Sequence, residues 1–323
     1  MTKLILLAGV VIFFAMNMGA SGIAPSFAAI YGSKWIRKKH AILLFGFFVI
    51  VGAALLGKNV ASTLGGGLLA KKYLSFNVTL IILASACLSL FLANILKIPQ
   101  STSQVTVGAI VGAGLYFKDL YIKTLLLKII PAWIILPFLS AFLTFFLYGR
   151  IYPPRHGNLH LYQAVFANEK KLRFSSLVMS CYVAFAIGTN NVANAAGPLF
   201  GAGILGINAG LWLVAPLFGI GASLIGKGPL ETAGKEIVPL GSISSVLVSF
   251  VTATLLIVAS SFGIPQSLVQ LNLFSIFAIS CLKNGHRCTL DYHITRKTFM
   301  VWVITPLISI GLSYLLLSVF VKI

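Results

Sequence analysis

Ten apolar stretches separated by short polar gaps take up most of this chain, and they constrain its fold more than any other feature. The hydrocarbon core of a bilayer is about 30 Å thick, which a helix of about 20 apolar residues can cross. Only 9% of the 323 residues are charged, whereas soluble domains carry about 25%. We therefore predict an all-α integral membrane protein with about ten transmembrane segments, near residues 4–31, 41–57, 77–97, 100–117, 124–148, 174–200, 203–225, 240–262, 265–282 and 299–321.

Three short motifs occur twice in the same order, which indicates a duplication. GAALLGKNVASTLG and GASLIGKGPLETAG, for example, share seven of fourteen positions. The Gly-x4-Gly-Lys spacing inside them resembles a phosphate-binding loop, but Gly228 stands where that loop needs Ser or Thr. We interpret this motif as a landmark of the repeat and expect no nucleotide binding. The paired ranges are 19–24 with 188–193 and 52–65 with 221–234, both offset by 169 residues, and 98–104 with 264–270, offset by 166.

The net charge of +19 would suggest nucleic acid in a soluble protein, but here the basic residues lie mostly in gaps between apolar stretches. The gaps at 32–40, 149–173 and 283–297 hold four or five each. With ten crossings these gaps share one side, which the positive-inside rule assigns to the cytoplasm, although Lys58 and a second lysine group do not follow the pattern. We predict a multi-pass protein of the cytoplasmic membrane, with both termini outside and no nucleic-acid partner.

Because each half has five crossings, an odd number, the second half is inserted in the membrane in the opposite orientation to the first. We expect transmembrane repeat 1 at 1–148, a basic cytoplasmic linker at 149–173 and an inverted transmembrane repeat 2 at 174–323. Inverted repeats with broken or re-entrant helices are typical of secondary transporters, which bind their substrate near the bilayer midplane at the repeat interface.

Polar residues interrupt the first and sixth segments at positions that the duplication pairs. Each unpaired polar group in hydrocarbon costs several kcal/mol, so these groups need partners or a ligand. Helix packing through small residues is the alternative, but three asparagines within five residues fit a site better. The candidates are Ser21 in the first segment and Asn190, Asn191 and Asn194 in the sixth.

Pro-Gln opens the fourth and ninth segments, where proline favours the start of a new helix. A helix start presents free N–H donors and a partial positive charge, and so can bind an anion. Plain N-capping explains each stretch alone, whereas two copies across a pseudo-twofold axis favour convergence on one ligand. The candidate ligands are Gln100, Ser101, Thr102 and Ser103 in one copy and Gln266 and Ser267 in the other.

These motifs resemble the inorganic phosphate transporter (PiT) family over nearly the whole chain, and in particular its sulfate permease branch. The family's Gly-x-Asn-Asp-x-Ala-Asn-Ala signature is matched by GTNNVANA at 188–195 except at Asn191, and weakly by GASGIAPS at 19–26. Its Pro-x-Ser-Thr-Thr-His stretch resembles Pro99–Gln104 and, less closely, Pro265–Gln270. The resemblance implies a secondary anion transporter with re-entrant hairpins at the Pro-x-Ser stretches. It also implies that Ser101, Thr102, Ser103 and Ser267 are oxyanion donors and that the signature residues bind substrate or coupling cation.

Both signature aspartates are absent, because Gly22 and Asn191 stand in their places, and this argues against sodium coupling. Monohydrogen phosphate carries a hydroxyl that needs an acceptor, ideally a carboxylate, whereas sulfate at neutral pH needs donors only. Mispairing of such a buried group discriminates strongly between ligands. We therefore predict sulfate import. The alternative is phosphate or another tetrahedral oxyanion, such as molybdate or thiosulfate, coupled to sodium or protons.

The membrane potential of a negative-inside cell opposes the import of a dianion by about 2.3 kcal/mol per charge per 100 mV. Uphill import therefore needs a co-transported cation. Glu231 and Glu236 are the only acids near the membrane in the region of a repeated motif and are candidates for relaying protons. A solvated ion-pair cluster is the alternative for them. Lys58 and Lys227 are candidates for attracting the anion at opposite entrances, with interfacial anchoring as the alternative. We expect proton coupling and leave open whether the chain forms a homodimer.

A membrane enzyme and a channel are the remaining alternatives. An enzyme would need a nucleophile–base pair or a metal cluster at membrane depth, but all five histidines lie in predicted cytoplasmic gaps. The cysteines and histidines at 281–293 fit no standard zinc spacing. Interrupted helices favour alternating access over a channel. We predict a transporter that is not an enzyme and has neither cofactor nor metal.

Overall fold

The computed structural model describes residues 1–95, 101–154, 156–160, 163, 168–226, 228, 230, 241–285 and 293–321. Within these ranges the secondary structure is helical apart from one isolated β-bridge, between Leu69 and Leu120. The α-helices are α1 (Thr2–Gly32), α2 (Lys38–Ser62), α3 (Phe76–Ile95), α4 (Thr102–Tyr116), α5 (Ile122–Thr124), α6 (Ile130–Gly149), α8 (Glu169–Asn190), α9 (Ala193–Gly201), α10 (Ile207–Leu224), α12 (Ser242–Ser261), α13 (Leu268–Asn284) and α15 (His293–Phe320). Short π-helical turns, η1 (Thr63–Gly67) and η3 (Leu125–Ile129), and a 3-10 turn, η2 (Lys71–Tyr73), join some of them.

The described ranges contain six helical stretches that are long and apolar enough to cross a membrane. Large apolar side chains such as Leu43, Phe142 and Trp212 are exposed on the outside of the bundle, where lipid would solvate them. The prediction of an all-α membrane protein is thereby confirmed. The six stretches are Thr2–Gly32, Lys38–Gly67, Ile122–Gly149, Glu169–Gly201, Ile207–Leu224 and Ile243–Ser261.

Of the two predicted helix interruptions, one is correct and one is wrong. The sixth segment does break, because α8 ends at Asn190 and α9 begins at Ala193. The first segment does not, since α1 runs continuously through its polar residues. The hydroxyls of Ser21 and Ser26 donate to the carbonyls of Met18 and Gly22 in their own helix, both at 3.0 Å. Short hydroxyl side chains can be satisfied within a helix in this way, whereas the longer asparagine amides reach other elements.

Glycines let the helices of the two halves approach closely in pairs. A Cβ atom on Gly19 of α1 would lie 2.2 Å from the Phe218 carbonyl oxygen of α10. A Cβ atom on Gly188 of α8 would lie 2.1 Å from the Val49 carbonyl oxygen of α2. Both members of the second contact are offset by 169 residues from their counterparts in the first. The α1–α10 contact therefore recurs as the α8–α2 contact, as a duplication requires.

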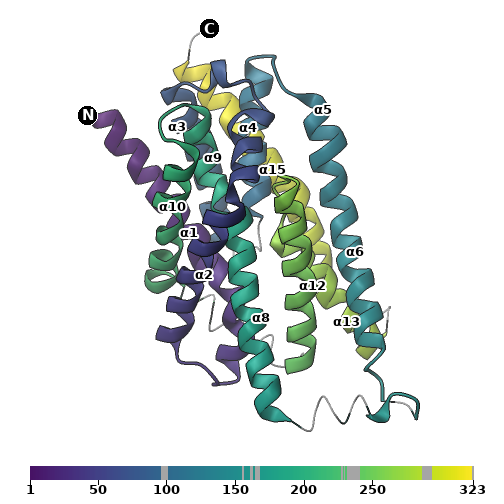
Figure 1. Ribbon diagram of the computed structural model, residues 1–323. Helices are drawn as coiled ribbons and strands as arrows, with labels where there is room; N and C mark the ends of the chain where they lie inside the picture. The colour runs from purple at the N-terminus through teal and green to yellow at the C-terminus, as the bar shows by residue number, and fades with distance from the viewer. Residues whose placement is uncertain are drawn as a thin grey trace.

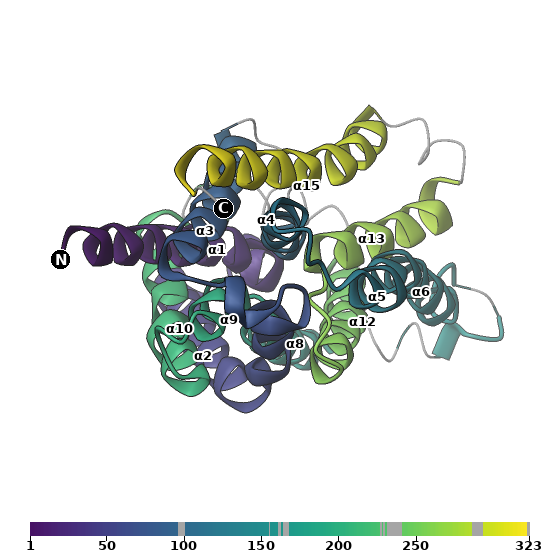
Figure 2. The ribbon, with the colours of Figure 1, turned by 90° about the horizontal axis from the view of Figure 1, so that it is seen from above.

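The last helix of each half packs on a short helix of the other half. Ser140 of α6 donates to the Leu271 carbonyl of α13 (3.0 Å), and Ser309 of α15 donates to the Val105 carbonyl of α4 (2.7 Å). These two bonds also correspond at the offsets of 169 and 166 residues. Seen from above, α4 lies beside α15, and α6 lies beside α13 (Figure 2). Each half thus supplies the support for the other half's short helix.

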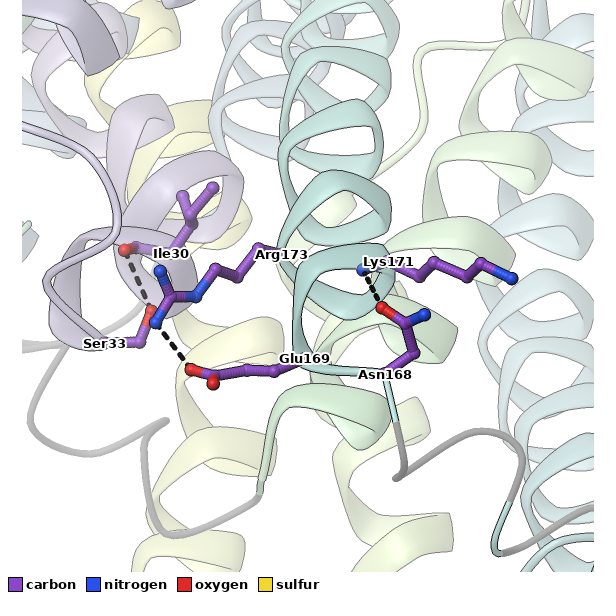
Figure 3. A network of polar contacts seen from close by, with 6 residues as sticks. All are labelled: Ile30, Ser33, Asn168, Glu169, Lys171 and Arg173. Atoms are coloured by element: carbon purple, nitrogen blue, oxygen red, sulfur yellow. Dashed lines mark hydrogen bonds and ion pairs between the residues drawn. The ribbon is translucent and has the colours of Figure 1, made fainter.

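The described parts of the basic gaps that the sequence places on one side lie at the lower end of Figure 1. The Arg173 guanidinium, near the start of α8, lies 5.0 Å from the centre of the Trp35 ring, just beyond the end of α1. Figure 3 shows Arg173 with its ion-pair partner Glu169 beside that end of α1. Because α1 ends where α8 begins, these corresponding helices run in opposite directions. Both chain termini lie toward the other end (Figure 1).

Helices α3 and α4 form one hairpin, and α12 and α13 form another. The Leu69–Leu120 bridge joins the chain before α3 to the chain after α4. Ile243 at the start of α12 and Ile279 near the end of α13 belong to one apolar cluster with Tyr148, at the lower end. Helix α4 has 15 residues, or about 22 Å, which is short of the hydrocarbon core. This geometry supports re-entrant hairpins, while the boundaries 1–148, 149–173 and 174–323 stay predictions.

Candidate functional site

Helices α4 and α13 begin in the same way. Ser101 and Ser267 are their N-caps, with extended backbones (φ −89°, ψ 114° and φ −88°, ψ 108°). Each hydroxyl accepts a hydrogen bond of 3.2 Å from the backbone N–H three residues on, at Gln104 and Gln270. The earlier N–H groups of each first turn have no partner within the helix and carry its partial positive charge. The predicted helix starts are therefore confirmed, with serine rather than the Pro-Gln pair as the cap.

The two helix starts meet inside the protein. The Ser103 hydroxyl of α4 donates to the carbonyl oxygen of Gln266, just before α13, at 3.1 Å. Asn190, at the end of α8, lies against both starts, since its Oδ1 accepts from Ser103 Oγ (3.3 Å) and from the backbone N–H of Gln266 (3.1 Å). The convergence expected for the 100–104 and 266–270 stretches is thus present in their described residues, 101–104 and 266–270.

The broken helix contributes a third element to the same place. Asn194 of α9 donates from Nδ2 to Thr102 Oγ1 (3.3 Å) and Ser103 Oγ (3.4 Å). We call this cluster the polar junction, and none of its side chains is more than 8% exposed. Its members are Ser101, Thr102, Ser103 and Gln104 at the start of α4, Asn190, Asn191 and Asn194 at the α8–α9 break, and Gln266, Ser267 and Gln270 at the start of α13.

Several amide atoms of the polar junction are buried without a hydrogen-bond partner. Buried polar groups in proteins are almost always paired, so a cluster of unpaired groups indicates that a ligand or water pairs with them. In the part of the chain that the structure describes, every unpaired buried amide atom belongs to this junction. These atoms are Gln104 Oε1, Asn191 Oδ1, Asn194 Oδ1, Gln266 Oε1, Gln266 Nε2 and Gln270 Oε1.

All ten side chains of the junction are neutral, and its positive potential comes from two helix starts. The two acidic residues in the described ranges lie at the ends of the bundle. Asp119 pairs with Lys72 (3.3 Å), and Glu169 pairs with Arg173 (2.5 Å). An anion would therefore meet hydroxyl, amide and backbone donors here, but no described carboxylate.

Some predicted site residues lie elsewhere. Ser21 bonds within α1, and no hydrogen bond in the described ranges joins it to the junction. Lys58 is exposed on α2. The other four candidates, Gln100, Lys227, Glu231 and Glu236, lie outside the described residues.

Sequence reasoning missed Ser260, a buried residue of α12 whose hydroxyl accepts a 2.9 Å bond from Asn190 Nδ2. Ser260 belongs to none of the repeated motifs, so no pattern in the chain could have indicated it. Thr189, whose hydroxyl lies 2.9 Å from the same oxygen, stands inside the GTNNVANA motif and could have been included.

A neutral, buried junction of helix starts within a bundle of apolar helices is the arrangement expected of an anion transporter of the membrane. The model of the phosphate transporter family matches residues 18–313, so this chain belongs to that family. The family resemblance drawn from the signature motifs is thereby confirmed. The chain is accordingly a multi-pass anion transporter of the cell membrane.

Individual relatives differ in the anion that their names specify. The chain is 38% identical to the sulfate permease CysP of Bacillus subtilis, over 96% of this chain and 86% of that protein. It is 23% identical to the putative phosphate permease TK2061 of Thermococcus kodakarensis, over 97% of each. A solved sodium-dependent phosphate transporter shares its fold with a TM-score of 0.82 at 22% identity, covering 99% of this chain and all of that one.

Proposed function

We propose that this protein imports sulfate by secondary active transport driven by protons. The observation that carries the proposal is the polar junction, where two helix starts and neutral donors converge without a described carboxylate. Sulfate at neutral pH accepts hydrogen bonds and offers none, which suits such a donor set. The greater similarity to a sulfate permease than to the putative phosphate permease supports the same choice.

Proton coupling is proposed from the energetics of a dianion. Against a membrane potential of about 100 mV, import of two negative charges is opposed by about 4.6 kcal/mol. Asn191 stands where the family signature has an aspartate, so the junction offers a sodium ion only neutral oxygens there. Glu231 and Glu236 remain candidates for carrying the protons, and Lys58 and Lys227 for attracting sulfate.

Phosphate is the second candidate, and one observation favours it. Five amide oxygens of the junction are buried without a donor, and any of them could accept a hydrogen bond from the hydroxyl of monohydrogen phosphate. A terminal amide can also rotate to present its NH2 group, so the same side chains could serve sulfate. The unpaired atoms therefore support an oxyanion ligand more strongly than they support one particular oxyanion.

Uptake of radiolabelled sulfate into proteoliposomes tests the proposal. The purified protein is reconstituted and given an inward proton gradient, an inward sodium gradient or neither, at the same imposed membrane potential. We expect sulfate accumulation with the proton gradient, and inhibition by thiosulfate and molybdate exceeding inhibition by phosphate. Equal displacement of label by phosphate would contradict the choice of sulfate. Accumulation that depends on sodium would contradict proton coupling, and failure to take up any of these oxyanions would contradict the transport function.

A further inference from the structure

Asn190 differs from the other amides of the polar junction because its side chain has no capacity left for a ligand. An asparagine amide offers two N–H donors and an oxygen with two lone pairs. Nδ2 donates to Ser260 Oγ (2.9 Å) and to the Ile264 carbonyl (3.0 Å). Oδ1 accepts from Ser103 Oγ and from the backbone N–H of Gln266. The Ser103 hydroxyl shares its one hydrogen between Asn190 Oδ1 and the Gln266 carbonyl, so protein atoms lie at all four positions of the Asn190 amide, and the residue is fully buried.

Its neighbour Asn191 shows the opposite pattern. Asn191 Oδ1 is buried without a partner, and the oxygen of Asn194 is unpaired as well. A ligand-binding amide needs free donors or acceptors, whereas a fully bonded one would have to break existing bonds to bind an anion. The two adjacent asparagines therefore have different roles: the amide of Asn190 bonds to protein atoms, and the oxygen of Asn191 is open to a ligand.

The bonds of Asn190 connect three elements whose relative position decides the geometry of the junction. It fixes the end of α8 to the α12–α13 connector at Ile264 and Gln266, and to the first turn of α4 at Ser103. Ser260 then anchors Asn190 to α12, because its own hydroxyl donates to the Leu256 carbonyl at 2.8 Å.

We infer that Asn190 is a positioning residue that sets the spacing of the two helix starts and does not touch the transported anion. Ser21, at the corresponding position of the first half, bonds within α1 and makes no equivalent bonds among the described residues. The statement that Asn190 does not touch an oxyanion rests on the proposed function. The spacing of the two helix starts can be measured without transport.

Hydrogen exchange of the α12–α13 connector tests the spacing directly. Asn190→Ser removes the acceptor of the Gln266 N–H, so exchange of the peptide containing it should quicken by about tenfold, the value for a lost bond of about 1.4 kcal/mol. Ser260→Ala should quicken the same exchange to a smaller extent, and the double variant should match Asn190→Ser alone because both act through one network. Asn191→Ala is the matched control and should leave the exchange unchanged.

Competition measurements separate positioning from ligand contact. Asn190→Ser should weaken the binding of sulfate, molybdate and phosphate by the same factor, because the donors at both helix starts move. Asn191→Ala should change the order of the three anions by affinity. Unchanged exchange at Gln266 in both Asn190→Ser and Ser260→Ala, or a changed ranking of anions in Asn190→Ser, would overturn the inference. If Asn190→Ser does not fold, Ser260→Ala tests the inference by the same two measurements, the hydrogen exchange at Gln266 and the ranking of the anions. Failure of the proposed function is distinguishable, since it would appear as absent uptake by the unaltered protein while the exchange result stands.

Discussion

Thr102 and Thr106 lie one turn apart on α4, and both are buried. The Thr106 hydroxyl donates to the Thr102 carbonyl of its own helix at 3.0 Å. The Thr102 hydroxyl accepts from Asn194, and in the described ranges its own hydrogen has no acceptor. At the scale of the residue, function therefore depends on which hydrogen-bonding positions the fold leaves open, more than on residue type.

Thr102→Val keeps the shape of the side chain and removes a donor from the junction. A hydrogen bond to a charged group contributes about 1.5–3 kcal/mol, so we expect the KM for sulfate to rise at least about tenfold. Thr106→Val is the control and should leave sulfate uptake close to that of the unaltered protein. Equal KM values for the two variants would remove Thr102 from the site.

Asn191→Asp restores the acid of the family signature inside the junction. A buried carboxylate beside a dianion is repelled by it, so sulfate uptake at neutral pH should fall by about tenfold or more. Burial raises the pKa of a carboxyl, so part of the uptake should return as the pH falls and the group becomes neutral. The control, Asn168→Asp, makes the same change at the exposed N-cap of α8 and should have no such pH dependence. If Asn191→Asp takes up sulfate as the unaltered protein does, both at neutral pH and at lower pH, this would contradict binding of the anion beside Asn191.

At the scale of the element, glycines set how closely helices pack. A Cβ atom on Gly221 of α10 would lie 2.0 Å from the Met16 carbonyl oxygen of α1, and one on Gly52 of α2 would lie 2.1 Å from the Phe185 carbonyl oxygen of α8. Backbone atoms cannot move aside as a flexible side chain can, so these helix pairs require glycine.

Gly221→Ala should force α1 and α10 apart. Overpacking of this kind costs about 1–3 kcal/mol, so we expect a clearly lower midpoint of thermal unfolding in detergent. Gly311→Ala, in α15, is the control because nothing lies within 4 Å of its added methyl group. Its midpoint should stay the same or rise, and a similar loss in both variants would show that close approach is not the cause.

A matched pair of hydroxyls gives a second test at this scale. Thr144 of α6 donates to Ser275 of α13 at 2.9 Å. Its counterpart Ser313 of α15 is buried without a partner, because Ala109 occupies the position in α4 that corresponds to Ser275. We expect Thr144→Val to lower the free energy of unfolding by about 1 kcal/mol and Ser313→Ala to leave it unchanged or raise it. Thermal unfolding of the two variants measures the difference, and a larger loss for Ser313→Ala would contradict it.

At the scale of the whole molecule, charge and direction of insertion are linked. Exposed basic residues such as Lys39 and Arg173 lie at one end of the bundle, and a smaller group that includes Lys72 and, in the loop after α4, Lys118 lies at the other. The excess of positive charge at the first end predicts that it faces the cytoplasm.

Thiol labelling of intact cells tests this orientation. In a variant whose four cysteines are replaced, a cysteine at position 118 should react with a membrane-impermeant reagent, because that loop is predicted to face outward. A cysteine at position 39 should react only after the membrane is made permeable. The reverse pattern would show that the protein inserts the other way.

Part of this protein could be read from its sequence. Apolar stretches predicted the helical membrane fold because lipid leaves the backbone no other partner than itself. The repeated motifs predicted a duplication with offsets of 169 and 166 residues, at which contacts between the halves recur, and the Pro-Gln pairs predicted the two helix starts. Local chemistry and periodicity determine all of these features.

Only the tertiary structure decided which of the candidate polar residues are fully bonded to the protein and which keep an atom open to a ligand. Ser21 and Asn190 correspond in the duplication, yet one bonds within its own helix and the other joins three elements. Asn190 and Asn191 are adjacent and identical, yet the first is fully bonded and the second has an unpaired oxygen. Whether an amide is free for a ligand depends on partners such as Ser260 and Gln266, about 70 residues away in sequence. No pattern within a single segment contains that information.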